Sequence, residues 1–219
     1  MRKLRSLYLL STAAFLVAAF CFGSVVVSRA YLARRRAEQL LAMLKGIQVG
    51  RTSRVTALEM MRPFMGHGSE TANGNSSQLA FAFDNDGLFF FRVAPYTEFR
   101  AMITFKNGIV VAKQAREFQP KSGCGAKVKE EIRGFGFAQG VAPEGYPSHV
   151  VHGEVPDFAG KTKRITVEDD NTYDETRRQA DWSFDLSCMT QFRGCDDARM
   201  MLPNVNRTSI SPGASGVGL

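Results

Sequence analysis

The chain has 219 residues, of which 44% are hydrophobic, and a formal net charge of +7 at pH 7. This charge is unevenly distributed: residues 1–58 hold ten Lys/Arg and one acidic residue, whereas residues 59–219 hold 18 basic and 20 acidic residues. A nucleic-acid-binding domain carries its basic residues on its own surface. Because residues 59–219 are nearly neutral, we do not expect this protein to bind nucleic acid.

A long apolar segment follows a short basic tail of residues 1–6. Residues 7–28 contain no charged side chain, and as a helix they would be about 33 Å long, enough to cross a hydrocarbon core of about 30 Å. A cleaved signal peptide is the alternative, because Ser28 and Ala30 are small, but its apolar core is usually only about 7–15 residues long. We therefore expect an uncleaved signal anchor, which is a single-pass transmembrane helix.

The next segment, residues 29–46, contains no helix breaker before Gly46 and predicts a juxtamembrane helix with an apolar stripe. Basic residues flank both ends of the apolar segment, so charge alone does not decide its orientation. The arginines that follow it are expected at the lipid headgroups of the bilayer, its first partner. These residues are Arg29, Arg34, Arg35 and Arg36.

From residue 47 the pattern predicts an α+β domain that extends to residue 202. A short amphipathic helix over residues 52–66 is followed by a loop over 67–78. Residues 79–93 read as two strands around Asp86–Gly87, and residues 100–118 as two strands around Asn107–Gly108. The sequence therefore predicts an antiparallel β-meander of about four strands, with an aromatic face that short helices cover.

The rest of the domain alternates between weaker signals. Residues 126–137, 148–155 and 162–169 are expected to form strands, and residues 172–186 a helix that begins with a capping box of Thr172 and Glu175. Residues 195–203 indicate one more helical turn. The small, polar residues 203–219 predict a disordered tail.

Histidines give the only candidate for catalysis or metal binding. His149 and His152 are close in sequence, with Asp157 nearby, but on a strand their odd spacing places them on opposite faces. The chain has no Gly-x-Ser-x-Gly, phosphate-loop, His-Glu-x-x-His or Cys-x-x-Cys motif. We therefore expect no catalytic residue, metal site or cofactor. The alternative is an envelope hydrolase that uses His149, His152 and Asp157.

Two cysteines, Cys188 and Cys195, bracket a short loop in which Gly194 can turn the chain. A metal site would need two further ligands, whereas a disulfide needs only Cα atoms within about 7 Å. Such a bond persists in an oxidising compartment, so it would place the domain outside the cytoplasm. Two buried thiols in a cytoplasmic domain are the alternative.

Two resemblances add to this interpretation. The basic N-terminus, single apolar segment, Arg-rich flank and "LSCMTQFRGCDDARMMLP" resemble uncharacterised bacterial single-pass membrane proteins, a group that implies no activity. The segment "IQVGRTSRVTALEMMRPFMG" before a β-meander is similar to the small outer-membrane-assembly lipoprotein (SmpA/OmlA) layout, in which short helices pack on a three-stranded sheet. This chain lacks the lipidated cysteine, and His67 replaces the usual proline, so the resemblance implies a fold alone.

The sequence thus predicts an anchored protein of the bacterial envelope, in the cytoplasmic (inner) membrane, with the N-terminus inside and the domain outside. We expect it to be a non-catalytic protein that binds or scaffolds an envelope protein. The remaining alternative is a cytoplasmic-facing protein held on the membrane surface by Arg34, Arg35 and Arg36.

Overall fold

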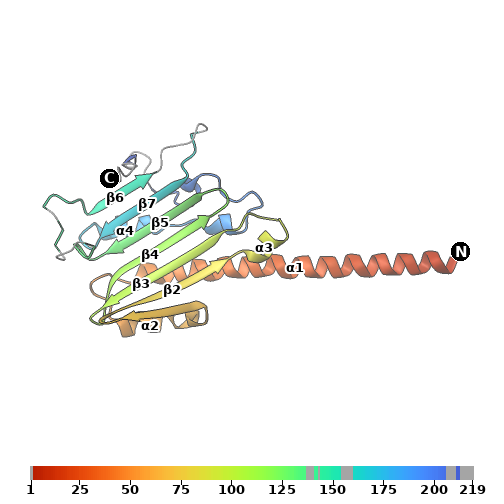
Figure 1. The fold of residues 1–219 in the computed structure, drawn as a ribbon, viewed down its shortest axis with the longest axis horizontal. Helices are drawn as coiled ribbons and strands as arrows, with labels where there is room; N and C mark the ends of the chain where they lie inside the picture. Colours follow the sequence, from red (N-terminus) through yellow and green to blue (C-terminus); the bar gives the residue numbers. More distant parts are fainter. Residues whose placement is uncertain (1, 137–140, 143, 154–159, 206–210, 213–219) are drawn as a thin grey trace.

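The computed structural model describes residues 2–136, 141–142, 144–153, 160–205 and 211–212. They form one long N-terminal helix, an open sheet of mixed but mostly antiparallel strands, and short helices against one face of that sheet (Figure 1). The predicted α+β class, with short helices packed on an antiparallel β-meander, is confirmed.

The long helix, α1 (Arg2–Gly46), extends far beyond the sheet at its N-terminal end (Figure 1). Its apolar part is long and apolar enough to span a membrane or act as a signal anchor, and none of that part is buried against the rest of the described structure. Large side chains such as Phe15 and Phe20 are about three-quarters exposed. A helix in the core of a soluble protein would instead bury these side chains.

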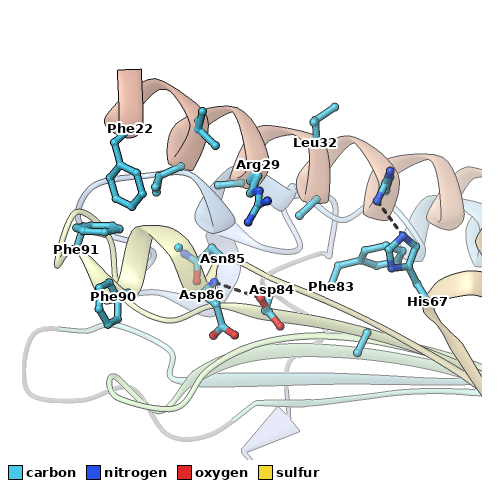
Figure 2. Close-up of a pocket in the computed structure, with 17 residues that line it drawn as sticks. Phe22, Arg29, Leu32, His67, Phe83, Asp84, Asn85, Asp86, Phe90 and Phe91 are labelled. Carbon is cyan, nitrogen blue, oxygen red and sulfur yellow. Dashed lines mark hydrogen bonds between the residues drawn. The ribbon is translucent and has the colours of Figure 1, made fainter. Parts of the chain in front are cut away.

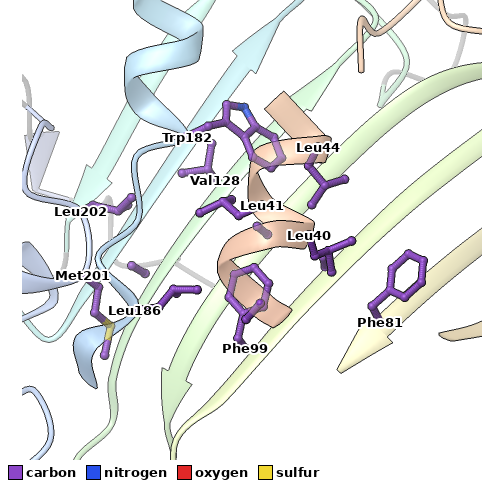
Figure 3. Packing of buried hydrophobic residues seen from close by; sticks show 14 of the residues in the cluster. Leu40, Leu41, Leu44, Phe81, Phe99, Val128, Trp182, Leu186, Met201 and Leu202 are labelled. Carbon is purple, nitrogen blue, oxygen red and sulfur yellow. The ribbon is translucent and has the colours of Figure 1, made fainter. Parts of the chain in front are cut away.

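The C-terminal end of the same helix lies in the core of the domain. Leu40, Leu41 and Leu44 are buried against the sheet, with Trp182 beside them (Figure 3). The buried Lys113 of the sheet ends the helix, because its Nζ donates to the carbonyls of Leu44 and Ile47 at 2.9 and 2.6 Å. The candidate membrane span and the central core helix are therefore one continuous element.

The sheet has the strand order β1-β2-β3-β4-β5-β7-β6-β8. The first five strands form an antiparallel meander, β7 pairs parallel to β5, and β6 pairs antiparallel to β7. Only two residues of β8 pair with β6. The strands are β1 (Gly68–Asn73), β2 (Ser76–Asp84), β3 (Glu98–Lys106), β4 (Ile109–Gln119), β5 (Cys124–Glu131), β6 (His149–Gly153), β7 (Arg164–Asp170) and β8 (Ser211–Pro212).

Two predictions within the meander were wrong. The expected loop over residues 67–78 contains β1, an exposed and polar edge strand that turns back at Gly74, whose φ is 57°. The polar composition of β1 gave no strand signal, since an edge strand needs no apolar face. The expected strand after Gly87 is instead the helix α3 (Asp86–Phe90), because Leu88 turns away from the sheet and packs against Ala30 of α1.

The hairpin at Asn107–Gly108 was predicted correctly. Both residues have positive φ, 52° and 77°, as the two-residue turn requires.

Short helices share the core side of the sheet with α1. Ser53 caps α2 (Arg54–Met61), which continues into the 3-10 helix η1 (Arg62–His67). Asp174 caps α4 (Glu175–Asp181), so the predicted cap at Thr172 was wrong; the Thr172 hydroxyl donates to Asp170 instead. Two further 3-10 helices complete this layer, η2 (Leu186–Met189) and η3 (Ala198–Met200).

Most of the predicted disordered tail, residues 203–219, lies outside the described residues. Within the part that is described, Val205 is buried in the core and Ser211–Pro212 form β8.

Candidate functional site

The face of the sheet opposite α1 is open, because no helix of the described residues lies over it; Figure 1 looks onto this open face. Its side chains alternate with the buried ones, as a half-buried sheet requires. On β3, for example, Phe99 and Ala101 are buried, whereas Arg100 between them is exposed.

A row of cations crosses the open face in register. Arg100 of β3 lies directly opposite Arg116 of β4, and Arg116 lies directly opposite Lys127 of β5. Side chains directly opposite each other on one face lie about 5 Å apart, where like charges destabilise a sheet. We call Arg100, Arg116 and Lys127 the basic row.

The basic row is only partly compensated by acids. Glu98 pairs with Arg100 at 2.5 Å, and among the described residues Arg116 and Lys127 form no ion pair. A fourth cation, Arg164, lies over the ring of Phe118 on the same face, 5.8 Å from the ring centroid.

Two shallow grooves flank Arg116 on this face. One, of about 270 Å³, lies over β4, β5 and β7 and is lined by Phe118, Lys127 and Arg164. The other, of about 440 Å³, lies over β1 to β4 and is lined by Arg100 and Met102. The basic row thus lies on a surface with relief, into which the side chains of a partner can fit.

A second cluster lies on the core side, where α4 meets β6 and β7. His149 Nδ1 lies 2.6 Å from Asp169 Oδ1 and 3.7 Å from Asp181 Oδ2, and its ring stacks on Tyr173 with centroids 4.5 Å apart. His149, Asp169 and Asp181 each offer one metal-ligand atom, and these atoms all lie within 4.8 Å of one another. A metal ion would need further ligands to complete its coordination.

Burial dominates the electrostatics of this cluster. It raises the pKa of Asp169 to about 7, with the nearby Glu130 adding to the effect, and it raises the pKa of Asp181 to about 6. Arg178 pairs with Glu130, which also pairs with Lys113 at 3.2 Å. The cluster is therefore one end of a buried ionic network that ties α4 to the sheet.

A histidine held by a carboxylate can also act as a base, provided that a nucleophile meets its other nitrogen. Among the described residues no hydroxyl or thiol forms a hydrogen bond with His149. His152 is exposed on the opposite face of β6, and Asp157 lies outside the described residues. The structure thus does not bring the two histidines together.

The predicted cysteine pair is present as a disulfide. Cys188 and Cys195 are bonded, with their Cα atoms 5.3 Å apart. Both are buried, and Gly194 adopts the expected turn with φ of 63°. Of the described cysteines, Cys21 and Cys124 are free thiols.

The arginines expected at the lipid headgroups have two different surroundings. Arg29, Arg35 and Arg36 are exposed, whereas Arg34 is half-buried. Arg34 pairs with Glu38 at 2.7 Å and donates to Thr190, and Arg36 Nη1 lies 2.8 Å from His67 Nε2. Contact of these four residues with lipid stays a prediction.

Comparisons with protein-family models, curated proteins and solved structures found no match. The two resemblances described above therefore stay expectations. The sheet has seven main strands besides the short β8, more than the three of the outer-membrane-assembly lipoprotein layout. Any conclusion on function must come from the residues of this chain.

The basic row was not found from the sequence. Its members are 11 and 16 positions apart and belong to three different strands, so no local motif links them. The alternation of buried and exposed side chains along each strand shows which residues face solvent. With the correct register between the strands, the three cations would have been aligned.

Proposed function

We propose that this protein is a non-catalytic, single-pass protein of the bacterial inner membrane that binds an acidic surface of a partner protein through its open sheet face. The observation that carries the proposal is the basic row of Arg100, Arg116 and Lys127. An anionic partner would relieve the repulsion between these directly opposite cations.

The chemistry of the row favours carboxylates on a folded protein or peptide. Two of its members are arginines, whose planar guanidinium groups bind carboxylates through two parallel hydrogen bonds. A nucleic acid needs a longer track of cations along its phosphates. Here the row covers only three strands, because the residues opposite its two ends, Ala82 of β2 and Thr166 of β7, are uncharged.

A photo-crosslinking residue at Gln114 tests the partner, because Gln114 lies beside the row and pairs with Met102 and Lys129. We expect a cross-linked protein in intact cells that disappears with the double variant Arg116→Glu/Lys127→Glu. The matched control places the same residue at Gln179 on α4, on the other side of the sheet. A cross-link that survives charge reversal, or one to nucleic acid, would contradict the proposal.

The orientation, with the N-terminus inside and the domain outside, is part of the same proposal. The disulfide supports it, since such bonds persist in oxidising compartments. Thiol labelling of Cys188 and Cys195 in intact cells tests it, in a variant that lacks Cys21 and Cys124. We expect labelling only after reduction. Labelling that requires lysis but no reductant would indicate the opposite orientation.

A further inference from the structure

A strongly apolar surface lies at the end of the sheet nearest the candidate span. In α3 and the turn after it, Phe89, Phe90 and Phe91 are consecutive and are 47%, 77% and 43% exposed. Val93 is also exposed. Contiguous aromatic side chains in water are unfavourable, so such a surface indicates a binding site for a protein or a membrane.

These aromatic side chains lie beside the apolar part of α1. Phe91 packs edge-to-face on Phe22, with ring centroids 5.2 Å apart, as Figure 2 shows. Leu88 is buried against Ala30, and a side chain at Gly87 would meet Val26 at 3.2 Å. The helix α3 is therefore packed closely on α1.

The position of Phe22 sets the depth of this surface. Phe22 precedes Ser28, the last residue of the predicted span, by six residues, which is about 9 Å along a helix. Amphipathic segments that lie in the membrane interface bury their apolar side by about 5–10 Å. If α1 spans the bilayer as expected, α3 reaches the same depth.

A second loop extends the surface. Phe192, at the tip of the loop closed by the Cys188–Cys195 disulfide, is 72% exposed. It shares a groove of about 830 Å³ with Phe89 and Phe90.

Cations line this groove beside the aromatic side chains, whereas Asp84 and Asp86 line the neighbouring groove that Phe90 and Phe91 share with α1. Arg92, Lys121 and Arg193 line the same groove, and none of them forms an ion pair with a described residue. Asp196, the acid of this groove, pairs with Lys161. Exposed aromatic groups with cations along one side match the layers of a bilayer surface, with the aromatic rings among the acyl chains and the cations at the phosphates.

Buried polar side chains hold the loops together. Asn85 Nδ2 donates to the carbonyls of Pro95 and Met189, both at 2.9 Å, and so ties the α3 turn to the disulfide loop. Gln119 accepts from the backbone N–H of Cys195 at 3.2 Å, which ties in the β4–β5 turn. A surface fixed in this way loses little conformational entropy when it binds.

We infer that α3 and the disulfide loop form a second membrane contact, which inserts Phe90, Phe91 and Phe192 into the bilayer that α1 crosses. Arg92, Lys121 and Arg193 then lie at the lipid phosphates. This contact rests on the membrane span of α1 and does not depend on a partner for the basic row.

Lipid quenching of a fluorophore tests the inference on the full chain in nanodiscs that contain doxyl-labelled phospholipid. An environment-sensitive fluorophore is attached at Phe90→Cys or Phe192→Cys in a variant that lacks Cys21, with the disulfide intact and Cys124 buried. The matched control is Val55→Cys on α2, an exposed position (69%) away from the α3 surface. We expect quenching at positions 90 and 192 to exceed that at position 55 several-fold.

Three results would overturn the inference. The first is equal quenching at positions 90 and 55. The second is a blue-shifted emission at position 90 without quenching, since that would mean that a second copy of the chain covers the surface. The third is quenching at position 90 that persists in the double variant Phe91→Asp/Phe192→Asp, because the apolar side chains would then not drive insertion. The emission of the single Trp182, which is buried in the core, verifies that each variant is folded.

Discussion

At the scale of single residues, Glu117 is the least expected side chain of the core. It lies on the buried face of β4, fully enclosed, and neither of its carboxylate oxygens has a hydrogen-bond partner among the described residues. Burial raises its pKa well above the usual value, and the nearby Asp185 adds to the effect. Glu117 is therefore protonated in the folded domain over a pH range in which the unfolded chain is ionised.

This shift predicts how stability depends on pH. A carboxyl group with a raised pKa in the folded state favours folding fully below its unfolded pKa, and this contribution is lost as pH rises towards the folded pKa. The free energy of unfolding should therefore fall as pH rises from about 4, the usual pKa of an unfolded carboxyl group, towards the raised pKa of Glu117. Asp169 and Asp181, whose pKa values are also raised, act in the same direction.

The variant Glu117→Gln should flatten this pH dependence, because the amide does not titrate. We expect it to be more stable than the wild type at pH 8, with a smaller difference at pH 5. Urea unfolding of the full chain in detergent, followed by Trp182 fluorescence, measures both values. Equal pH slopes in the two proteins would contradict the expected titration.

At the scale of elements, α1 joins two environments in one helix. Its core end contributes Leu40, which is fully buried, whereas Leu32, two turns earlier, is 54% exposed. Large-to-small changes in a core lose both transfer free energy and packing. Leu40 and Leu32 are therefore a matched pair of substitution sites, one buried and one exposed, on the same helix.

We expect Leu40→Ala to lower the free energy of unfolding by about 2–5 kcal/mol, and Leu32→Ala by about 0.5 kcal/mol or less. Both variants keep the helix propensity high, so the difference reports burial alone. Urea unfolding in detergent measures the two values. Similar losses in the two variants would show that the end of α1 is not a core element.

The disulfide is the second element with a measurable contribution. It closes a loop with a sequence separation of seven residues. The chain-entropy relation for such a loop gives about 2.5 kcal/mol of stabilisation. The double variant Cys188→Ala/Cys195→Ala should lose about this much, and the addition of reductant should then change its unfolding curve no further.

Cys21→Ala is the control for the disulfide variant, since Cys21 is exposed on α1 and lies outside the domain. It should unfold like the wild type and keep its sensitivity to reductant. Loss of stability in this control would indicate a contribution from α1 that the disulfide does not explain.

Local signals explain which elements were predictable. Asn107–Gly108 predicts its hairpin because the turn chemistry is contained in two residues. The strand β1 was missed because its composition is polar, although its partner β2 follows it directly along the chain. The helix α3 was missed because its packing partner, Ala30 of α1, lies far from it in sequence. The same holds for the site: His149 was found by sequence, but its partner Asp169 is set by the pairing of β6 with β7.

At the scale of the whole molecule, the candidate span and the core of the domain share one helix, α1. The buried residues of α1 begin at Ala30 and continue to Leu44, before the predicted start of the domain at residue 47. A domain cut at that boundary would lose the helix that covers the centre of the sheet, as Figure 3 shows.

Two truncations test this. A chain without residues 1–28 should fold with a cooperative urea transition and a buried Trp182, because it keeps the buried residues of α1 from Ala30 to Leu44. A chain without residues 1–46 should show no cooperative transition, since the sheet would lose Leu40, Leu41 and Leu44. Cooperative unfolding of the shorter chain would refute the role of α1 in the core.

The continuity of α1 also limits the reach of the protein. From Ser28 to Gly46 the helix rises only about 27 Å, and no flexible tether lies between the span and the core helix. The strands run obliquely along α1 (Figure 1). If the candidate span crosses the bilayer as proposed, the open face stands roughly perpendicular to the membrane and faces sideways. A partner in the same membrane meets that face by two-dimensional search at a raised local concentration, whereas a partner in the surrounding solution must first come to the bilayer.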